Sequence, residues 1–316
     1  MIVQRIFQLP AGLIVLFCLV ISSVLATAND AAPSDTNSDL CAKTAKAVQN
    51  ACEAEGEANY WIAVGNCNNL SSASARKACK QQAQQDRRDA NGECAEQFEA
   101  RRKLCTALNE TTYNPVINPT NFVEGITNPF FPMIPSTTLI YRGGNEVVTV
   151  TVTNRTKVIL GVKCVVVRDV VTVNDQVVED TEDYFAQDMQ GNIWYFGELS
   201  QEFDNGDLIS LAGSFKAGVN GAKPGIIMKA NPQVGDIYRQ EFLLGEAEDI
   251  AEVISLTRSE SVPAASCNND CLVTKESTPL EPGTIGNKYY AWGIGVILEI
   301  NPASGQRVEL VEIIRK

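Results

Sequence analysis

The sequence predicts an α+β, multi-domain chain in which a disulfide-laddered antiparallel α-helical hairpin precedes a mainly antiparallel all-β barrel or sandwich. Six cysteines between residues 41 and 105 have mirror-image spacing. The same stretch is rich in Ala, Gln, Glu, Lys and Arg, a composition typical of long helices. From residue 137 onward, β-branched residues alternate with other types, and turn signals recur about every ten residues. A chain of 316 residues is long enough for two domains.

Residues 1–28 have the pattern of a secretory signal peptide. Arg5 precedes an apolar run from about Leu13 to Leu25, Ala26 and Ala28 flank Thr27, and cleavage is expected after Ala28. The alternative is an uncleaved membrane anchor, for which the run is short. No later stretch could span a bilayer, so we expect no transmembrane segment after signal removal and a secreted or periplasmic protein. Residues 29–39 form a polar spacer, which we expect to be disordered.

The hairpin, residues 40–107, is predicted from its cysteines. When the six are paired from the outside inward, the residue numbers of every pair add to 146: Cys41 with Cys105, Cys52 with Cys94, and Cys67 with Cys79. Two antiparallel helices that rise about 1.5 Å per residue bring such residues to the same height. An oxidising compartment favours disulfides between them. The alternative is a thiol-lined metal store.

Three cysteines remain in the rest of the mature chain. Cys267 and Cys271 are four residues apart and can close a small loop, which leaves Cys164 as a free thiol in an apolar strand. A bond between Cys164 and Cys271 is the alternative.

Residues 108–136 contain five prolines and are expected to be a connector or an extended wrapping segment. Residues 137–316 are predicted to form an acidic all-β domain of about ten strands. Glu146–Asn154 and Gly161–Asn174 are two of these strands, and Asn174-Asp175, residues 204–207 and residues 302–305 have the composition of hairpin turns.

Charge and composition exclude several classes of function. The net charge of −12 belongs to the second domain, because residues 41–105 hold ten Lys or Arg against eight Asp or Glu. Nucleic acids and anionic membrane surfaces are therefore poor partners. The chain contains no histidine, which removes catalytic triads and zinc sites that use imidazole. We expect no metal and no cofactor.

Several phrases of the second domain carry a resemblance. They are Asn128-Pro129-Phe130-Phe131-Pro132, residues 179–188 (EDTEDYFAQD), residues 191–198 (GNIWYFGE), residues 278–283 (TPLEPG) and Lys288-Tyr289-Tyr290-Ala291. From about Asn128 to the C-terminus the chain resembles a family of uncharacterised secreted bacterial proteins. The resemblance implies an exported bacterial β-domain. It implies no activity and no functional residues.

The candidate site lies in a predicted hairpin about residues 188–191. Pairing Gln187 with Asn192 would place two carboxylates among aromatic rings on one face. The residues of this face are Thr181, Asp183, Phe185, Trp194, Phe196 and Glu198. The candidate ligand-binding residues are Asp183, Phe185, Trp194, Phe196, Glu198 and Arg239. Of these, Asp183 and Glu198 could act as acid and base in a glycan hydrolase. Alternatively, they are core acids held by Arg239.

A calcium site is a further possibility, formed by other acids nearby in the sequence. Asp180, Glu182, Asp188 and residues 204–207 could supply oxygens, but no EF-hand loop is present, and turn formation explains Asn205-Gly206. We therefore expect an exported, non-enzymatic binding or structural module for an unidentified small molecule, glycan or protein. The alternatives are the hydrolase and a protein-interaction component of a cell-surface assembly.

Overall fold

The computed structural model describes residues 40–109 and 112–315, and the signal peptide and spacer predicted for residues 1–39 lie outside them. The chain begins as two antiparallel helices, α1 (Leu40–Asn68) and α2 (Ala73–Leu108). Ser72 caps α2, since its hydroxyl accepts a hydrogen bond from the Ala75 backbone N–H at 3.3 Å. Asn109 ends this helix in the left-handed conformation, with φ of 49°.

Three disulfides join the helices and confirm the predicted ladder. The Cα–Cα distances are 5.9 Å for Cys41–Cys105, 5.8 Å for Cys52–Cys94 and 5.5 Å for Cys67–Cys79. Small residues allow this close approach, because Ala45, Gly56 and Ala83 are buried in the helices. So narrow a contact cannot supply a core of its own, and the covalent bonds replace one.

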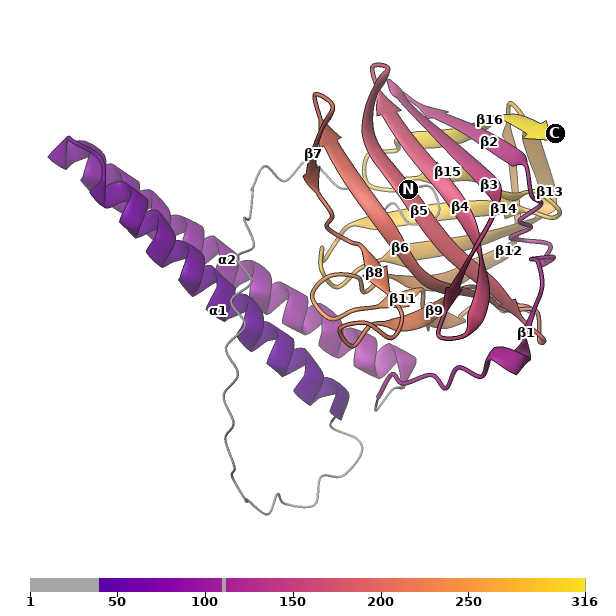
Figure 1. Ribbon diagram of the computed structural model, residues 1–316, viewed down its shortest axis with the longest axis horizontal. Helices are drawn as coiled ribbons and strands as arrows, with labels where there is room; N and C mark the ends of the chain where they lie inside the picture. Colours follow the sequence, from indigo (N-terminus) through magenta and orange to yellow (C-terminus); the bar gives the residue numbers. More distant parts are fainter. Residues whose placement is uncertain (1–39, 110–111, 316) are drawn as a thin grey trace, which may run out of the picture.

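The rest of the chain forms a nearly closed antiparallel barrel (Figure 1). Within the described residues, thirteen strands follow the order β10-β12-β13-β14-β15-β16-β2-β3-β4-β5-β6-β9-β11. β1, β7 and β8 are short and pair with β5 or β6. Strands of two to four residues raise the number above the ten expected. The bounds are β1 (Phe122–Val123), β2 (Thr137–Gly143), β3 (Glu146–Ile159), β4 (Val162–Val173), β5 (Gln176–Asp188), β6 (Ile193–Asp204), β7 (Asp207–Ser210), β8 (Phe215–Lys216), β9 (Lys223–Met228), β10 (Ile237–Arg239), β11 (Glu241–Phe242), β12 (Ile250–Val262), β13 (Ala265–Ser277), β14 (Ile285–Ala291), β15 (Gly295–Ile300) and β16 (Arg307–Arg315).

The predicted turns connect these strands. Asn174 and Asp175, between β4 and β5, both have positive φ, at 50° and 63°. Asn205 and Gly206, between β6 and β7, have φ of 50° and 88°. Two successive residues of positive φ are typical of the tight turns that match the twist of a hairpin.

Alternate residues of the long strands fill the barrel. On β3, for example, Val148, Val150 and Val152 are buried in the main core cluster. The barrel is almost closed at β9 and β10. A Cβ atom at Gly225 would lie 2.2 Å from the Gln240 carbonyl oxygen, so only glycine permits this approach.

The proline-containing segment, residues 112–136, packs on the outer face of the barrel up to Phe122, while Ile126, Phe131 and Met133 are buried in the main core cluster. Tyr113 donates a hydrogen bond to the Pro224 carbonyl at 2.8 Å. β1 pairs with the end of β5. Phe122 packs against Phe196 in a second, outer apolar cluster, with ring centroids 5.4 Å apart.

Two further features concern cysteine and the membrane. Cys267 and Cys271 form a disulfide within β13, and Cys164 is the free, buried cysteine of the described residues. No helix in residues 40–109 or 112–315 is long and apolar enough to cross a bilayer. Four disulfides fit an oxidising, extracellular or periplasmic setting.

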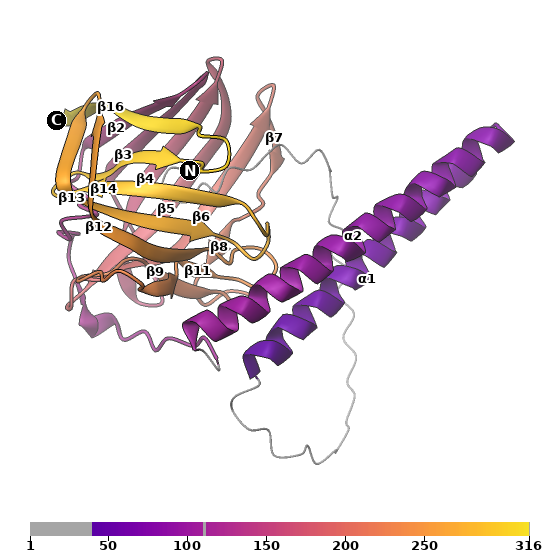
Figure 2. The ribbon, with the colours of Figure 1, turned by 180° about the vertical axis from the view of Figure 1, so that it is seen from behind.

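Figures 1 and 2 show how the two parts are arranged. The open end of the hairpin, where α1 begins and α2 ends, lies beside the barrel, and the turn between the helices projects far from it. The C-terminus lies at the side of the barrel away from this projecting arm.

Candidate functional site

The hairpin of β5 and β6 differs from the prediction in its register. Gln187 pairs with Ile193, not with Asn192, and a bulge shifts the register between Tyr184 and Phe185. Gly197, the cross-strand partner of Tyr184, has φ of 144°. Phe196, between Tyr195 and Gly197, has no partner on β5, and this extra residue reverses the alternation of side chains along β6.

The predicted shared face is therefore wrong for two of its aromatic residues. Phe196 and Trp194 belong to the outer cluster with Phe122, whereas Phe185 stacks on Tyr195 inside the barrel, with ring centroids 4.7 Å apart. The bulge was the missed signal, and Gly197 in the middle of an aromatic strand is the residue that could have indicated it.

Asp183 and Glu198 do come together. They are direct cross-strand partners, and both side chains are buried inside the barrel, at 0% and 7% exposure. Thr181 lies on the same inner face and pairs with Ser200. The Tyr195 hydroxyl donates a hydrogen bond to Asp183 Oδ1 at 2.5 Å.

Both acids are held towards their neutral forms. Burial and the neighbouring Asp169 carboxylate raise the pKa of Asp183. Burial raises the pKa of Glu198, and the nearby carboxylates of Glu241 and Asp183 raise it further. A glycosidase needs both acids in contact with its sugar or with water, whereas both of these side chains are buried inside the barrel.

Arg239 lies elsewhere. Its neighbour Tyr238 faces the core beside Ala251, so alternation turns Arg239 to the outer side. There its guanidinium lies 5.5 Å from the Tyr113 ring centroid and 5.0 Å from that of Phe242. The structure thus brings Asp183, Glu198 and Phe185 to the barrel interior and separates them from Trp194, Phe196 and Arg239.

A second group of buried polar residues was not found from the sequence. Lys288 Nζ lies 2.5 Å from Glu276 Oε2, and both residues are fully buried. Thr274, Gln240 and Tyr290 each donate a hydrogen bond to Glu276 Oε1. Burial lowers the pKa of Lys288, but Glu276 and other acids raise it more, so the amine stays charged. Strand alternation places Lys288 and Tyr290 on one face, but sequence alone does not indicate that this face is inward.

The acids of the calcium alternative have other contacts. Asp180 pairs with Arg168, and Glu182 pairs with Arg155. Asp188 accepts hydrogen bonds from Asn192 and from the Trp194 indole. Nowhere in the described ranges do three or more Cys, Asp or Glu side chains form a group that could hold a metal ion.

One pocket opens at the side of the barrel where the chain ends. The space between its walls is about 600 Å³, a figure that includes open solvent at the mouth. We call it the end pocket. Its lining is apolar apart from Thr137, Tyr141 and Arg315, and Tyr141 uses its hydroxyl to donate a hydrogen bond to the Val296 carbonyl at 3.0 Å. The apolar lining includes Phe131, Leu139, Val150, Val152, Ile294 and Ile313.

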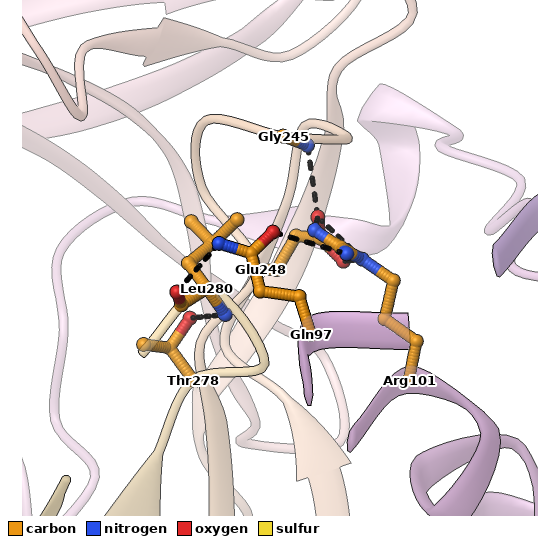
Figure 3. A network of polar contacts seen from close by, with 6 residues as sticks. All are labelled: Gln97, Arg101, Gly245, Glu248, Thr278 and Leu280. Atoms are coloured by element: carbon orange, nitrogen blue, oxygen red, sulfur yellow. Dashed lines mark hydrogen bonds and ion pairs between the residues drawn. The ribbon is translucent and has the colours of Figure 1, made fainter. Parts of the chain in front are cut away.

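A second pocket, of about 410 Å³, lies between the hairpin and the barrel. Arg101 of α2 crosses it and binds Glu248, with Nη2 2.7 Å from Oε1 (Figure 3). The same carboxylate accepts a hydrogen bond from the Gly245 N–H, and Gln97 donates to the Leu280 carbonyl. These contacts are satisfied within the protein, so this pocket is a structural joint.

Comparisons of the chain with protein-family models, curated proteins and solved structures give no match. The resemblance to secreted bacterial proteins therefore stays a prediction.

Proposed function

We propose that the protein is an exported, non-enzymatic binding module whose site is the end pocket and whose ligand is an apolar small molecule. The observation that carries this proposal is the lining of the pocket, which is apolar on the strap from residues 131 to 134, on β2 and β3, and on residues 293–296. Ligand sites typically combine such an apolar lining with a few polar groups.

The position of the acids supports binding over catalysis. Neither Asp183 nor Glu198 lines the end pocket or the pocket beside the hairpin. A glycan hydrolase needs both acids in a cleft open to a sugar and to water. The hydrolase alternative predicts release of reducing ends from glycans by the wild type and loss of that release in Asp183→Asn. We expect no release from either protein.

The test of binding uses N-phenyl-1-naphthylamine, a neutral dye that fluoresces in apolar sites. We expect saturable binding to the full chain without residues 1–28. Ile294→Trp should abolish it, because the larger side chain fills the pocket from a half-buried turn. Leu208→Trp, at an exposed position on β7, is the control and should bind as the wild type does. Equal dye binding by all three proteins would refute the site.

A second candidate is a protein-interaction role for the hairpin. Trp61 and Ile62 on α1 are 60% and 63% exposed, which is unusual for large apolar side chains side by side. Sedimentation of the wild type and of Trp61→Ala tests its simplest form, self-association. If both proteins are monomeric, self-association through the hairpin is refuted.

Bacterial export through a cleaved signal peptide belongs to the same proposal. The four disulfides support an oxidising compartment. N-terminal sequencing of the exported protein tests it, and we expect the mature chain to begin at Asn29.

A further inference from the structure

We propose that the end pocket takes a single-chain amphiphile with an anionic head group, and that Arg315 and Thr137 bind this head. The inference rests on the proposed function, and it adds the chemical class of the ligand. It starts from the few polar groups in an otherwise apolar site.

Thr137 provides the first observation. It lines the end pocket and is 8% exposed, yet its Oγ1 atom is buried without a hydrogen-bond partner among the described residues. A buried hydroxyl without a partner costs free energy, and native proteins rarely keep one. A ligand oxygen in the pocket would give this hydroxyl an acceptor.

Arg315 provides the second observation. It is the charged residue among those that line the pocket, and it pairs directly with Thr137 across β16 and β2. Directly opposed residues of an antiparallel pair have their side chains on one face, with Cβ atoms about 5 Å apart. The guanidinium and the hydroxyl can therefore reach the same head group. Within residues 40–109 and 112–315, Arg315 has no ion pair.

The chemistry of the two donors selects the head. A guanidinium stays charged at every working pH and binds a carboxylate or phosphate through two parallel hydrogen bonds. The threonine hydroxyl adds one more donor. The protein as a whole carries a net charge of −12 and repels anions at long range, so the selection has to come from these local contacts.

Apolar residues inside the pocket and at its rim suit the alkyl chain of an amphiphile. Besides the two polar residues, the site is lined by Val150 and Val152, which are buried, and by the half-buried Leu139. At the rim Ile134 is 49% exposed, and the nearby Trp292 is 66% exposed and packs edge-on against Phe130. An exposed apolar rim gives the chain of an amphiphile a path from water into the pocket.

The experiment is isothermal titration calorimetry with three probes of equal chain length. They are decanoate, 1-decanol and decyltrimethylammonium, which are anionic, neutral and cationic. We expect the wild type to bind decanoate at least about tenfold more tightly than decyltrimethylammonium, since a hydrogen bond to a charged group contributes about that much. Decanol should bind with intermediate affinity.

Variants of the two polar residues test the binding of the head group separately from that of the alkyl chain. Arg315→Gln should weaken decanoate about tenfold and change decanol less than twofold. Arg315→Lys should keep part of the decanoate affinity, because the charge is retained. Thr137→Val should weaken decanoate a few-fold. The control is Arg142→Gln. Arg142 is exposed, lies on β2 like Thr137 and does not line the pocket, so all three affinities should stay unchanged.

The outcomes distinguish this inference from the proposed function. If decanol and decanoate bind equally well to the wild type and to Arg315→Gln, the anionic head is refuted while apolar binding stands. Stronger binding of decyltrimethylammonium than of decanoate would also refute it. If none of the three probes binds the folded wild type, the proposed function fails as well.

Discussion

Arg101 of α2 and Glu248 of the barrel form a buried ion pair that joins the two parts of the molecule. The guanidinium Nε lies 3.0 Å from Oε2, and Nη2 lies 2.7 Å from Oε1. The side chains are 5% and 2% exposed. Such a contact fixes the direction of the hairpin against the barrel, because two parallel hydrogen bonds restrict rotation about either one.

The ion pair should be costly to break from one side. We expect Arg101→Ala to lower the free energy of unfolding by about 3–5 kcal/mol, because it leaves the Glu248 carboxylate buried and uncompensated. Urea unfolding followed by circular dichroism measures this. Arg102→Ala, its exposed neighbour, should cost less than about 0.5 kcal/mol. The double variant Arg101→Met with Glu248→Leu should recover most of the lost free energy of unfolding. If Arg101→Ala and Arg102→Ala lower the free energy of unfolding equally, the assigned role of the ion pair is wrong.

The middle disulfide should stabilise the hairpin. Replacing Cys52 and Cys94 by serine should cost about 2–4 kcal/mol and reduce the helical signal at lower urea than in the wild type. Non-reducing peptide mapping should link Cys52 to Cys94 and Cys41 to Cys105. A peptide that links Cys41 to Cys52 would show that the ladder is wrong.

Cys164 should be the one free thiol in the protein without residues 1–28. It is fully buried, and burial raises its pKa to about 12. Since the thiolate is the reactive form, a thiol reagent should modify no cysteine in the folded protein and one in urea. Fast modification of the folded protein, or of a second cysteine in urea, would contradict this assignment.

Asp249 should give the stability a dependence on pH. Burial and the Glu276 carboxylate raise its pKa to about 7, against a partial opposing effect of Lys288. The folded state then keeps a proton that the unfolded chain releases from about pH 4 upward. Stability should therefore fall as pH rises from about 4 to about 7, by up to about 4 kcal/mol, and be level above that.

The measurement for Asp249 is a series of urea midpoints from pH 4.5 to pH 8. Asp249→Asn cannot release a proton, so its midpoints should fall less over this range. Asp207→Asn, at the exposed start of β7, should follow the wild type. Parallel slopes for the wild type and Asp249→Asn would remove the assigned role.

Gly197 should not tolerate a side chain. A Cβ atom there would lie 2.4 Å from the Phe215 carbonyl oxygen, and its φ of 144° is costly for any other residue. We expect Gly197→Ala to lower the free energy of unfolding by about 2–4 kcal/mol in a thermal or urea scan. Gly206→Ala, in an open turn with no atom near the added carbon, should cost clearly less. The reverse order would mean that the bulge is misassigned.

Most of the architecture could be predicted from the sequence because it depends on spacing. The sum of 146 fixes the three disulfides between helices, and the Asn-Asp and Asn-Gly pairs fix two tight turns. The candidate site could not be predicted in full, because one extra residue near Gly197 moves Trp194 and Phe196 to the other face of the sheet. Nothing local in the sequence says whether a bulge or a regular pair will form.

The end pocket could not be predicted from the sequence for a different reason. Its residues come from the strap at 131–134, from β2, β3 and β16, and from the turn before β15, segments separated by up to about 180 positions. Closure of the barrel brings them together, and no short motif records it. Arg315 and Thr137 are neighbours only through the pairing of β16 with β2.

The most direct test of the central claim, that an apolar ligand binds in the end pocket, is a methyl NMR titration with 1-decanol. We expect saturable shifts for the methyl groups of Val150, Val152, Ile294 and Ile313, which line the pocket. Ile159 and Val166 in the outer cluster should not move. Saturable shifts confined to the outer cluster, or no saturable shift at any methyl group, would contradict it.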